Sequence, residues 1–464
     1  MSKKLYTLLS VLVLAAMLLS ACGGGAATPT EAPTEPVVEE PTEVMEEPTE
    51  VMEEPTEAGG EVATGEIDCM GAQPGDEVTM FYQWTGTEEE QLTQILQPLV
   101  DACGITLAPE ASRDQALLDT RIQAGTPPDI AFFNVVQLQQ YADRLVPLTD
   151  FGVDEGNYPD FWRELGSVGG TWLGMPVKAD IKSIIWYNPV NFEAFGYEVP
   201  QTWDELDALV EQMVADGNTP WSMGLESEAA TGWTGSDFIQ DILLVQQGPD
   251  YVMSLINGET PYNDAGVAQA YETYGAWATD DQYTVGGAQG TLTTAFRDAI
   301  MHIVTDPPQA MMVKQSGFAG NEIAAEYPDL EYGVDYDFFP VPDLQGVQGG
   351  SDWMMAFSDE PAVAAIFAYL GSDLGGQTWA EVGFGVTPNT AGFGNYEEGT
   401  ALGNLATILE GAQGFTPDIG DTIPGGFGTA EWTAIINYLN GEDLQASLDQ
   451  AAQVQQEALA GEGQ

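Results

Sequence analysis

Residues 78–84 (VTMFYQW), 105–108 (ITLA) and 129–133 (DIAFF) are short, largely apolar runs separated by segments with helical spacing. Runs of this length and composition are typical of buried β-strands. After the first run, Thr87 and Glu90 have the spacing of a capping box, and apolar residues follow at helical intervals as far as Gly104. The alternation of strands and helices predicts an α/β fold with a mainly parallel sheet and right-handed crossovers.

Ligands of parallel sheets bind at the carboxyl ends of the strands. This rule selects polar and aromatic residues at the ends of the three runs: Trp84, Thr85, Arg113, Asp114 and Asn134. An aromatic face, a guanidinium beside a carboxylate and an amide fit an uncharged, polar ligand with apolar C–H faces, namely a sugar. Each residue also has a structural explanation, because Trp84 could belong to the core and Arg113–Asp114 could form a surface ion pair.

The composition excludes several kinds of chemistry. The 464 residues include 10 basic and 73 acidic side chains, one His and three Cys, for a net charge of −63. A His-rich metal site and a four-thiolate zinc site are therefore excluded, and we predict neither a metal nor a cofactor. So large an acidic excess also excludes a broad nucleic-acid interface, which needs clustered Lys and Arg.

The N-terminus has the pattern of an export signal. Lys3 and Lys4 precede a mostly apolar stretch at 5–19, which is too short for a stable membrane-spanning helix. Residues 19–23 (LSACG) match a bacterial lipobox, so we expect a signal peptide and lipobox at 1–22 and a lipid on Cys22; the alternative is a plain secretory signal with an incidental Cys. The lipid would be the only membrane attachment and would hold the protein outside the cytoplasm on the cell membrane.

Residues 23–75 are predicted to be a disordered acidic tether. The repeated Pro-Thr-Glu theme within them carries many Glu and no aromatic residue, so it cannot bury a core. Cys69 and Cys103 are the remaining cysteines of a chain predicted to be exported, and we expect a disulfide between them. Two buried free thiols are the alternative.

Several segments farther along the chain resemble one known family. The segments at 125–130 (GTPPDI), 171–177 (TWLGMPV), 184–189 (IIWYNP) and 200–206 (PQTWDEL) resemble, in this order, those of the family 1 extracellular solute-binding proteins of ABC importers. The chain is further similar to the α-glucoside-binding branch at 182–188 (KSIIWYN), 219–221 (TPW), 230–233 (ATGW), 333–340 (GVDYDFFP) and 349–353 (GGSDW). The resemblance covers roughly residues 76 to 460.

The resemblance implies two doubly wound α/β lobes joined by a three-crossing hinge, as in type II periplasmic binding proteins. The N-terminal lobe would comprise 76–177 and 341–385, and the C-terminal lobe 178–340 and 386–464. The chain would cross between the lobes near Pro176, near 340–342 and near residue 386.

The same resemblance extends the candidate site across both lobes. It implies that Lys178 lies beside an interlobe cleft, although Lys178 could instead simply pair with Asp180. Trp233 would be an aromatic platform on the second lobe, and Phe318 stands where relatives offer another aromatic. Asp352 and Trp353 follow a Gly pair that lets backbone approach closely, which fits a cleft wall.

These observations predict a lipid-anchored, monomeric substrate-binding protein that is not an enzyme. It would bind a neutral mono- or oligosaccharide, such as an α-glucoside, and deliver it to the transmembrane subunits of an ABC permease. Two other classes stay open, namely an extracellular glycoside hydrolase with a carboxylate pair and an adhesion lipoprotein without a soluble ligand. Polyols or glycerol-phosphate-like solutes are a second ligand class for the same fold.

Overall fold

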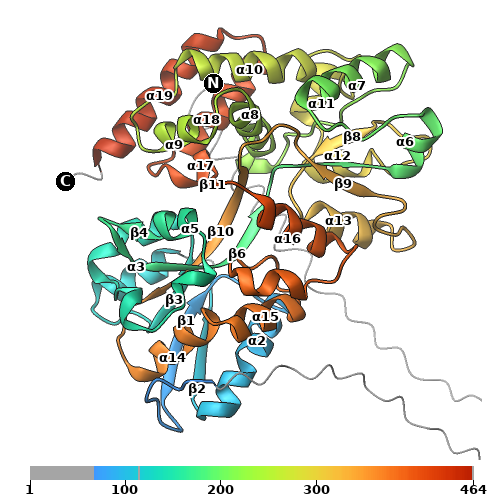
Figure 1. Ribbon diagram of the computed structural model, residues 1–464. Helices are drawn as coiled ribbons and strands as arrows, with labels where there is room; N and C mark the ends of the chain where they lie inside the picture. The colour runs from blue at the N-terminus through green and yellow to red at the C-terminus, as the bar shows by residue number, and fades with distance from the viewer. Residues whose placement is uncertain (1–66, 113–114, 462–464) are drawn as a thin grey trace, which may run out of the picture. The chain divides into compact units, whose positions relative to one another are not determined.

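The computed structural model describes residues 67–112 and 115–461 (Figure 1). The predicted signal peptide, the lipid site at Cys22 and most of the predicted tether lie outside these residues, as do Arg113 and Asp114. In the described part of the chain, no helix combines the length and the apolar character needed to cross a membrane.

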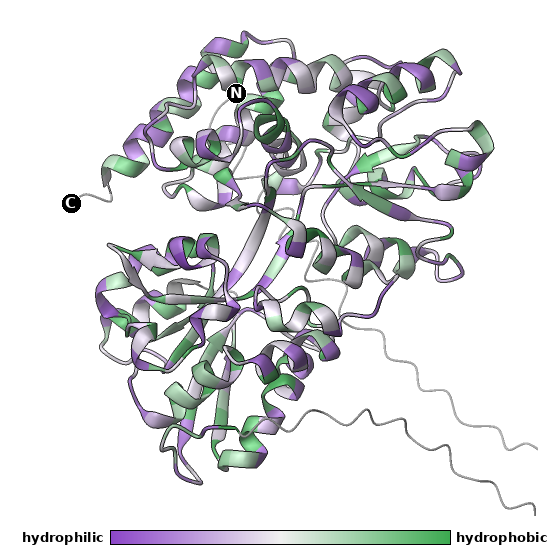
Figure 2. Ribbon diagram, in the orientation of Figure 1, coloured by the Kyte–Doolittle hydropathy of each residue, from purple (hydrophilic) through white to green (hydrophobic). Residues whose placement is uncertain are grey.

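The three apolar runs form the first sheet, as predicted. β1 (Glu77–Tyr82) pairs in parallel with β2 (Thr106–Ala111) and with β3 (Ile130–Phe133), and α2 (Thr87–Cys103) and α3 (Gln115–Gln123) are the crossover helices. The strand order is β11-β10-β3-β1-β2. The helices of this sheet carry both purple and green residues in Figure 2, as expected when one face is buried and the other meets water.

The predicted capping box of α2 is wrong. Thr87 is itself the first helical residue, the N-cap is Gly86, and no side chain caps this end. Glu88 and Glu89 bond elsewhere, to Lys178 and to the Tyr82 hydroxyl. The other end is as predicted, because Gly104 adopts the left-handed conformation with a φ of 69°.

Two long strands connect the first sheet to the second lobe. β10 (Val347–Ala356) runs antiparallel to β3 and to β6 (Gly174–Ile181), and in parallel with the short β11 (Phe415–Pro417). The elements packed around these strands and the first sheet are α4 (Val135–Gln140), α5 (Asp160–Leu165), β4 (Ser167–Val168), β5 (Thr171–Trp172), α14 (Pro361–Leu370), α15 (Asp373–Val382), η5 (Thr390–Asn395) and α16 (Ala401–Gly411).

The second lobe contains a smaller sheet and many helices. Its sheet has the order β8-β7-β9, built antiparallel from β7 (Ile184–Tyr187), β8 (Met312–Lys314) and β9 (Asp337–Pro340). Trp221 adds parallel bridges to Thr284 and Met312. The helices are α6 (Pro189–Phe195), α7 (Trp203–Ala215), α8 (Trp233–Gln246), α9 (Pro249–Ile256), α10 (Ala265–Ala278), α11 (Gly287–Thr293), α12 (Phe296–Met301), α13 (Ala319–Glu326), α17 (Ile419–Thr422), α18 (Phe427–Leu439) and α19 (Leu444–Gly461).

Within the described residues the chain passes between the lobes three times. The first passage lies at Lys182–Ser183, later than expected, because β6 pairs with β10 along its whole length. The second runs from β9 to β10, close to the expected 340–342. The third extends over α16 and β11 to α17: Val386 bridges to Ala179 of β6, α16 lies beside both Gly383 and Gly317, and β11 still pairs with β10.

The disulfide between Cys69 and Cys103 is present, with the two Cα atoms 5.5 Å apart. It joins the segment before β1 to the last residue of α2, which confirms the predicted pairing.

Candidate ligand-binding site

The strand β6 presents a row of charged residues on one face. Lys178, Asp180 and Lys182 alternate with Ala179 and Ile181, which are buried at 4% and 1% exposure. Successive side chains of a strand point to opposite faces, so the three charges share the face away from the core. Lys178, Asp180 and, from the neighbouring β10, Asp352 are called the binding strip below.

Residues of the first lobe bond Lys178 and Asp352, which form one end of the binding strip. The Lys178 ammonium lies 2.9 Å from Glu88 and 4.6 Å from the ring centroid of Phe384. Asp352, the register partner of Lys178, accepts a hydrogen bond of 2.8 Å from the Gln83 amide. Burial raises the pKa of the Asp352 carboxyl to about 6, and the positive charge of Lys178 opposes this rise.

Asp180 lies at the middle of the binding strip. Water reaches its side chain, yet desolvation by the surrounding protein raises the pKa of its carboxyl, against the attraction of Lys182 and Lys178. Gly317 lies beside this carboxyl group, because a Cβ on Gly317 would be 3.9 Å from Asp180 Oδ1.

Phe318, which directly follows Gly317, belongs to a cluster of three aromatic rings. Phe318, Trp233 and Phe296 contact one another, with centroid distances of 5.2 Å for Trp233–Phe296, 6.2 Å for Trp233–Phe318 and 6.1 Å for Phe296–Phe318. All three rings are only partly buried, so part of their apolar surface is available to a ligand. Trp233 is the first residue of α8 and Phe318 immediately precedes α13, so the positions of both rings are set by helix ends.

The structure corrects two of the predicted contacts. Trp84 and Trp353 are buried, at 2% and 0% exposure, and offer no surface to a ligand. The ring of Trp84 packs between Phe132 and Phe384, and that of Trp353 packs against Trp162. Both indoles therefore belong to the core, and neither Trp84 as an aromatic face nor Trp353 as part of a cleft wall can contact a ligand.

The other predicted residues fall into separate groups. Lys178 and Asp352 are close to each other, and Trp233 and Phe318 are in contact in the second lobe. Thr85 is exposed. Asn134 is also exposed, but its side chain caps α4 by accepting a hydrogen bond of 3.0 Å from the Val136 N–H.

Sequence reasoning did not select Glu88, Asp180 or Phe296. The alternation of 178–182 is a local signal that could have placed Asp180 on the face of Lys178. Phe296 has no such signal, since it reaches Trp233 only through the tertiary fold. Among the described residues, no group of three His, Cys, Asp or Glu side chains is placed to hold a metal ion.

Comparisons with known proteins bear on the family of the chain. The family model described as bacterial extracellular solute-binding protein matches residues 87–373. The osmoprotective compounds-binding protein GgtB of Synechocystis sp. is 32% identical over 386 residues, which cover 80% of this chain and 91% of that protein. The alpha-glucosides-binding periplasmic protein AglE of Rhizobium meliloti is 32% identical over 82% of this chain and 86% of its own.

Solved structures of low sequence identity share the fold. The solute receptor AcbH, whose reported preference is β-D-galactopyranose, superposes with a TM-score of 0.68 at 20% identity, covering 82% of this chain and 99% of that receptor. Maltose-bound MalE3 of T. maritima has a TM-score of 0.59 at 17% identity, covering 82% of this chain and 100% of its own. Both likenesses bear on the two-lobed α/β fold.

Proposed function

The chain belongs to the bacterial extracellular solute-binding proteins, and on that premise we propose that it binds a neutral sugar, an α-glucoside or another small oligosaccharide. The observation that carries the proposal is that Gly317, the neighbour of Phe318, lies beside Asp180 of the binding strip, and that the partly exposed ring of Phe318 contacts Trp233. Carboxylates and ammonium groups form strong hydrogen bonds with hydroxyl groups, and aromatic faces pack against the C–H faces of a sugar ring.

The charges around the binding strip favour an uncharged ligand. Asp180 and Asp352 contribute carboxyl groups, and Glu88 already pairs with Lys178. The whole chain is strongly acidic as well. An anionic solute such as a sugar phosphate would meet repulsion both at the strip and over the surface.

Capture and delivery complete the proposal. The sugar would stabilise a closed arrangement of the lobes through its higher affinity for that state, and the permease of an ABC importer would receive it. A lipid on Cys22 and the part of the acidic segment that precedes the disulfide at Cys69 would hold the monomeric protein near its permease, outside the cytoplasm. The relative AglE is named for alpha-glucosides, which supports the ligand class.

A second ligand class is favoured by one relative. GgtB matches this chain over nearly its whole length and is named for osmoprotective compounds. A small glycoside of a polyol offers the same hydroxyl groups and C–H faces as a disaccharide, so it would suit the same residues.

A thermal-shift panel tests the proposal, because a ligand that binds only the folded state raises the melting temperature. The panel contains maltose, trehalose, sucrose, glycerol and glucose 6-phosphate. We expect a rise with at least one neutral disaccharide, none with the phosphate, and confirmation by calorimetry. The absence of a shift with every neutral sugar would contradict the proposal.

A further inference from the structure

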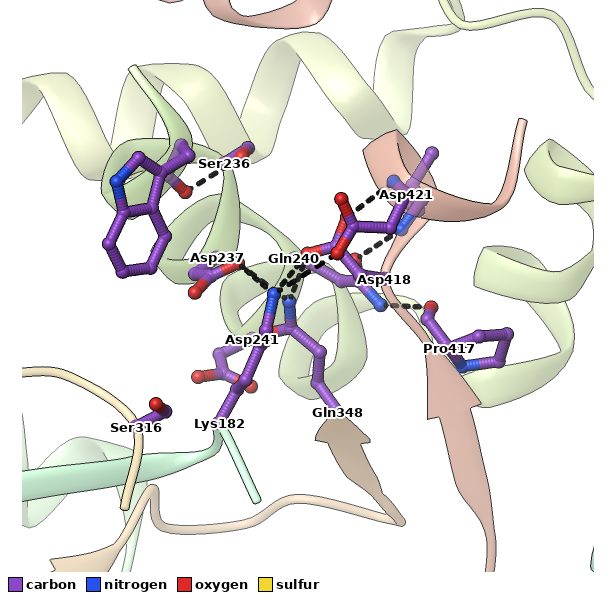
Figure 3. Close-up of polar contacts among 12 residues, drawn as sticks. Lys182, Ser236, Asp237, Gln240, Asp241, Ser316, Gln348, Pro417, Asp418 and Asp421 are labelled. Carbon is purple, nitrogen blue, oxygen red and sulfur yellow. Dashed lines mark hydrogen bonds and ion pairs between the residues drawn. The ribbon is translucent and has the colours of Figure 1, made fainter. Parts of the chain in front are cut away.

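Each passage between the lobes contributes one side chain to a single cluster. Lys182 comes from the first passage, Gln348 from the second and Asp418 from the third. Together with three residues of α8, Asp237, Gln240 and Asp241 (Figure 3), and with Ser183, they form what is called the hinge clamp below.

Lys182 is at the centre of the hinge clamp. Its ammonium lies 3.1 Å from Asp237, 3.0 Å from Asp418 and 3.7 Å from Asp421, and its side chain is only 12% exposed. The Gln348 amide donates to the same two buried carboxylates, at 3.4 Å to Asp237 and 3.2 Å to Asp418. One cation and one amide therefore join all three passages.

The side of α8 that faces the three passages makes the remaining hydrogen bonds of the hinge clamp. Asp237, Gln240 and Asp241 are spaced three and four residues apart, which places them on one side of the helix. Gln240 donates to the Pro417 carbonyl and accepts from the Ile419 N–H, each at 2.9 Å, and so holds the third passage.

Ser183 links the first two passages to the same helix. Its hydroxyl donates to Asp241 at 2.5 Å and accepts from the Gln348 N–H at 2.8 Å. Every passage in the described residues is thus hydrogen-bonded to one face of α8.

The charges of the hinge clamp depend on one another. Burial disfavours the charge of Lys182, yet the surrounding carboxylates raise its pKa well above the ordinary value. Burial raises the pKa of Asp237 to about 8, whereas Lys182 holds the pKa of Asp418 below its ordinary range in spite of burial. Removal of the Lys182 cation would leave buried carboxyl groups without their counter-charge, which costs free energy. The contacts of the hinge clamp therefore stabilise one another.

The same helix carries the aromatic platform. Trp233 begins α8 and lies one turn before Asp237, on the same side of the helix. We propose that Lys182 is a positioning residue for ligand binding: by tying the three passages to α8, it fixes Trp233 relative to the binding strip. Lobe motion then pivots on the first-lobe side of the hinge clamp, while the passages move with the second lobe.

The first test needs no sugar and so stands even if the proposed ligand is wrong. Spin labels at Gln94→Cys on α2 and Glu272→Cys on α10, both exposed positions, report the distance between the lobes. In the sugar-free protein, Lys182→Met should broaden the distance distribution, and Lys182→Arg, which keeps a cation, should restore the narrow one. Arg121→Met is the matched control, because Arg121 is a partly buried cation that pairs with Glu110 within the first lobe.

The second readout rests on the proposed function and uses maltose and trehalose. Lys182→Met should weaken the affinity for the bound sugar on the order of tenfold, while Lys182→Arg and Arg121→Met stay near the wild type. An unchanged distance distribution in Lys182→Met, or failure of Lys182→Arg to restore it, would overturn the inference.

If Lys182→Met does not fold, hydrogen exchange of the unmutated protein tests whether the passages are held to α8. The amides of Lys182, Gln348 and Ile419 should exchange as slowly as the core of α8, as one cooperative unit. Faster exchange at these three amides than in α8 would mean that the passages are not held to the helix.

Discussion

Lys178 and Asp352 are register partners on β6 and β10, yet each is held mainly by a different residue of the first lobe. Lys178 pairs with Glu88 at 2.9 Å and Asp352 accepts from Gln83 at 2.8 Å. The opposite charges of Lys178 and Asp352 therefore stay next to each other without neutralising each other in a direct pair. Such an arrangement keeps both groups able to bond a hydroxyl-bearing ligand.

The buried carboxyl of Asp352 should make stability depend on pH. Its pKa is about 6 in the folded protein and 3.8 ordinarily, so the folded state holds this proton more tightly. The stabilising effect of the protonated form is complete below about pH 4 and is lost as the pH rises through 6. Asp352→Asn, which can still accept from Gln83, should remove this dependence.

Urea unfolding of both proteins at pH 4, 5, 6 and 7 measures the effect. The free energy of unfolding of Asp352→Asn minus that of the wild type should rise by about 2–3 kcal/mol from pH 4 to pH 6. A constant difference across this range would show that Asp352 titrates normally.

Trp233→Ala should weaken sugar binding by at least about 1 kcal/mol, because it removes an aromatic face beside the binding strip. Trp203→Ala is the matched control, since Trp203 stacks on Trp277 within the second lobe at a centroid distance of 5.7 Å. Calorimetry with the sugar selected by the thermal-shift panel gives both affinities, and melting curves show that each variant is folded. Equal affinities for Trp233→Ala and the wild type would remove this ring from the site.

Local sequence patterns predicted the first sheet well and the site less well. The runs of apolar residues at 78–84 and 129–133 are local features of the sequence, so they predict these strands without knowledge of the tertiary fold. Whether an indole faces a ligand or the core depends on rings far away in the chain, such as Phe384 for Trp84 and Trp162 for Trp353.

The disulfide should contribute substantially to the stability of the first lobe. It closes a loop between residues 34 positions apart, and loss of such a bond costs about 2–4 kcal/mol. The double variant Cys69→Ser/Cys103→Ser should show this decrease in urea unfolding. Its sugar affinity should be unchanged at temperatures where it is folded, because the bond lies at the far end of α2 from Glu88. A decrease below about 0.5 kcal/mol would show that the bond restrains little.

Gly232 sets the start of α8 and with it the position of Trp233. Its φ is 117°, and a Cβ at this position would lie 2.6 Å from the Trp432 Cβ. Gly232→Ala therefore combines backbone strain with a clash, and should both destabilise the protein and weaken sugar binding by displacing the indole. Gly217→Ala is the matched control, because Gly217 has a φ of 84° and no atom within 4 Å of the added Cβ.

Gly217→Ala should cost about 1–2 kcal/mol from strain alone and leave the affinity unchanged. Gly232→Ala should cost more than Gly217→Ala, by an amount that reports the clash with Trp432. Urea unfolding and calorimetry on the two variants separate these effects, because only the clash moves the helix end. If Gly232→Ala lost stability but bound sugar as the wild type does, the position of Trp233 would not depend on this contact.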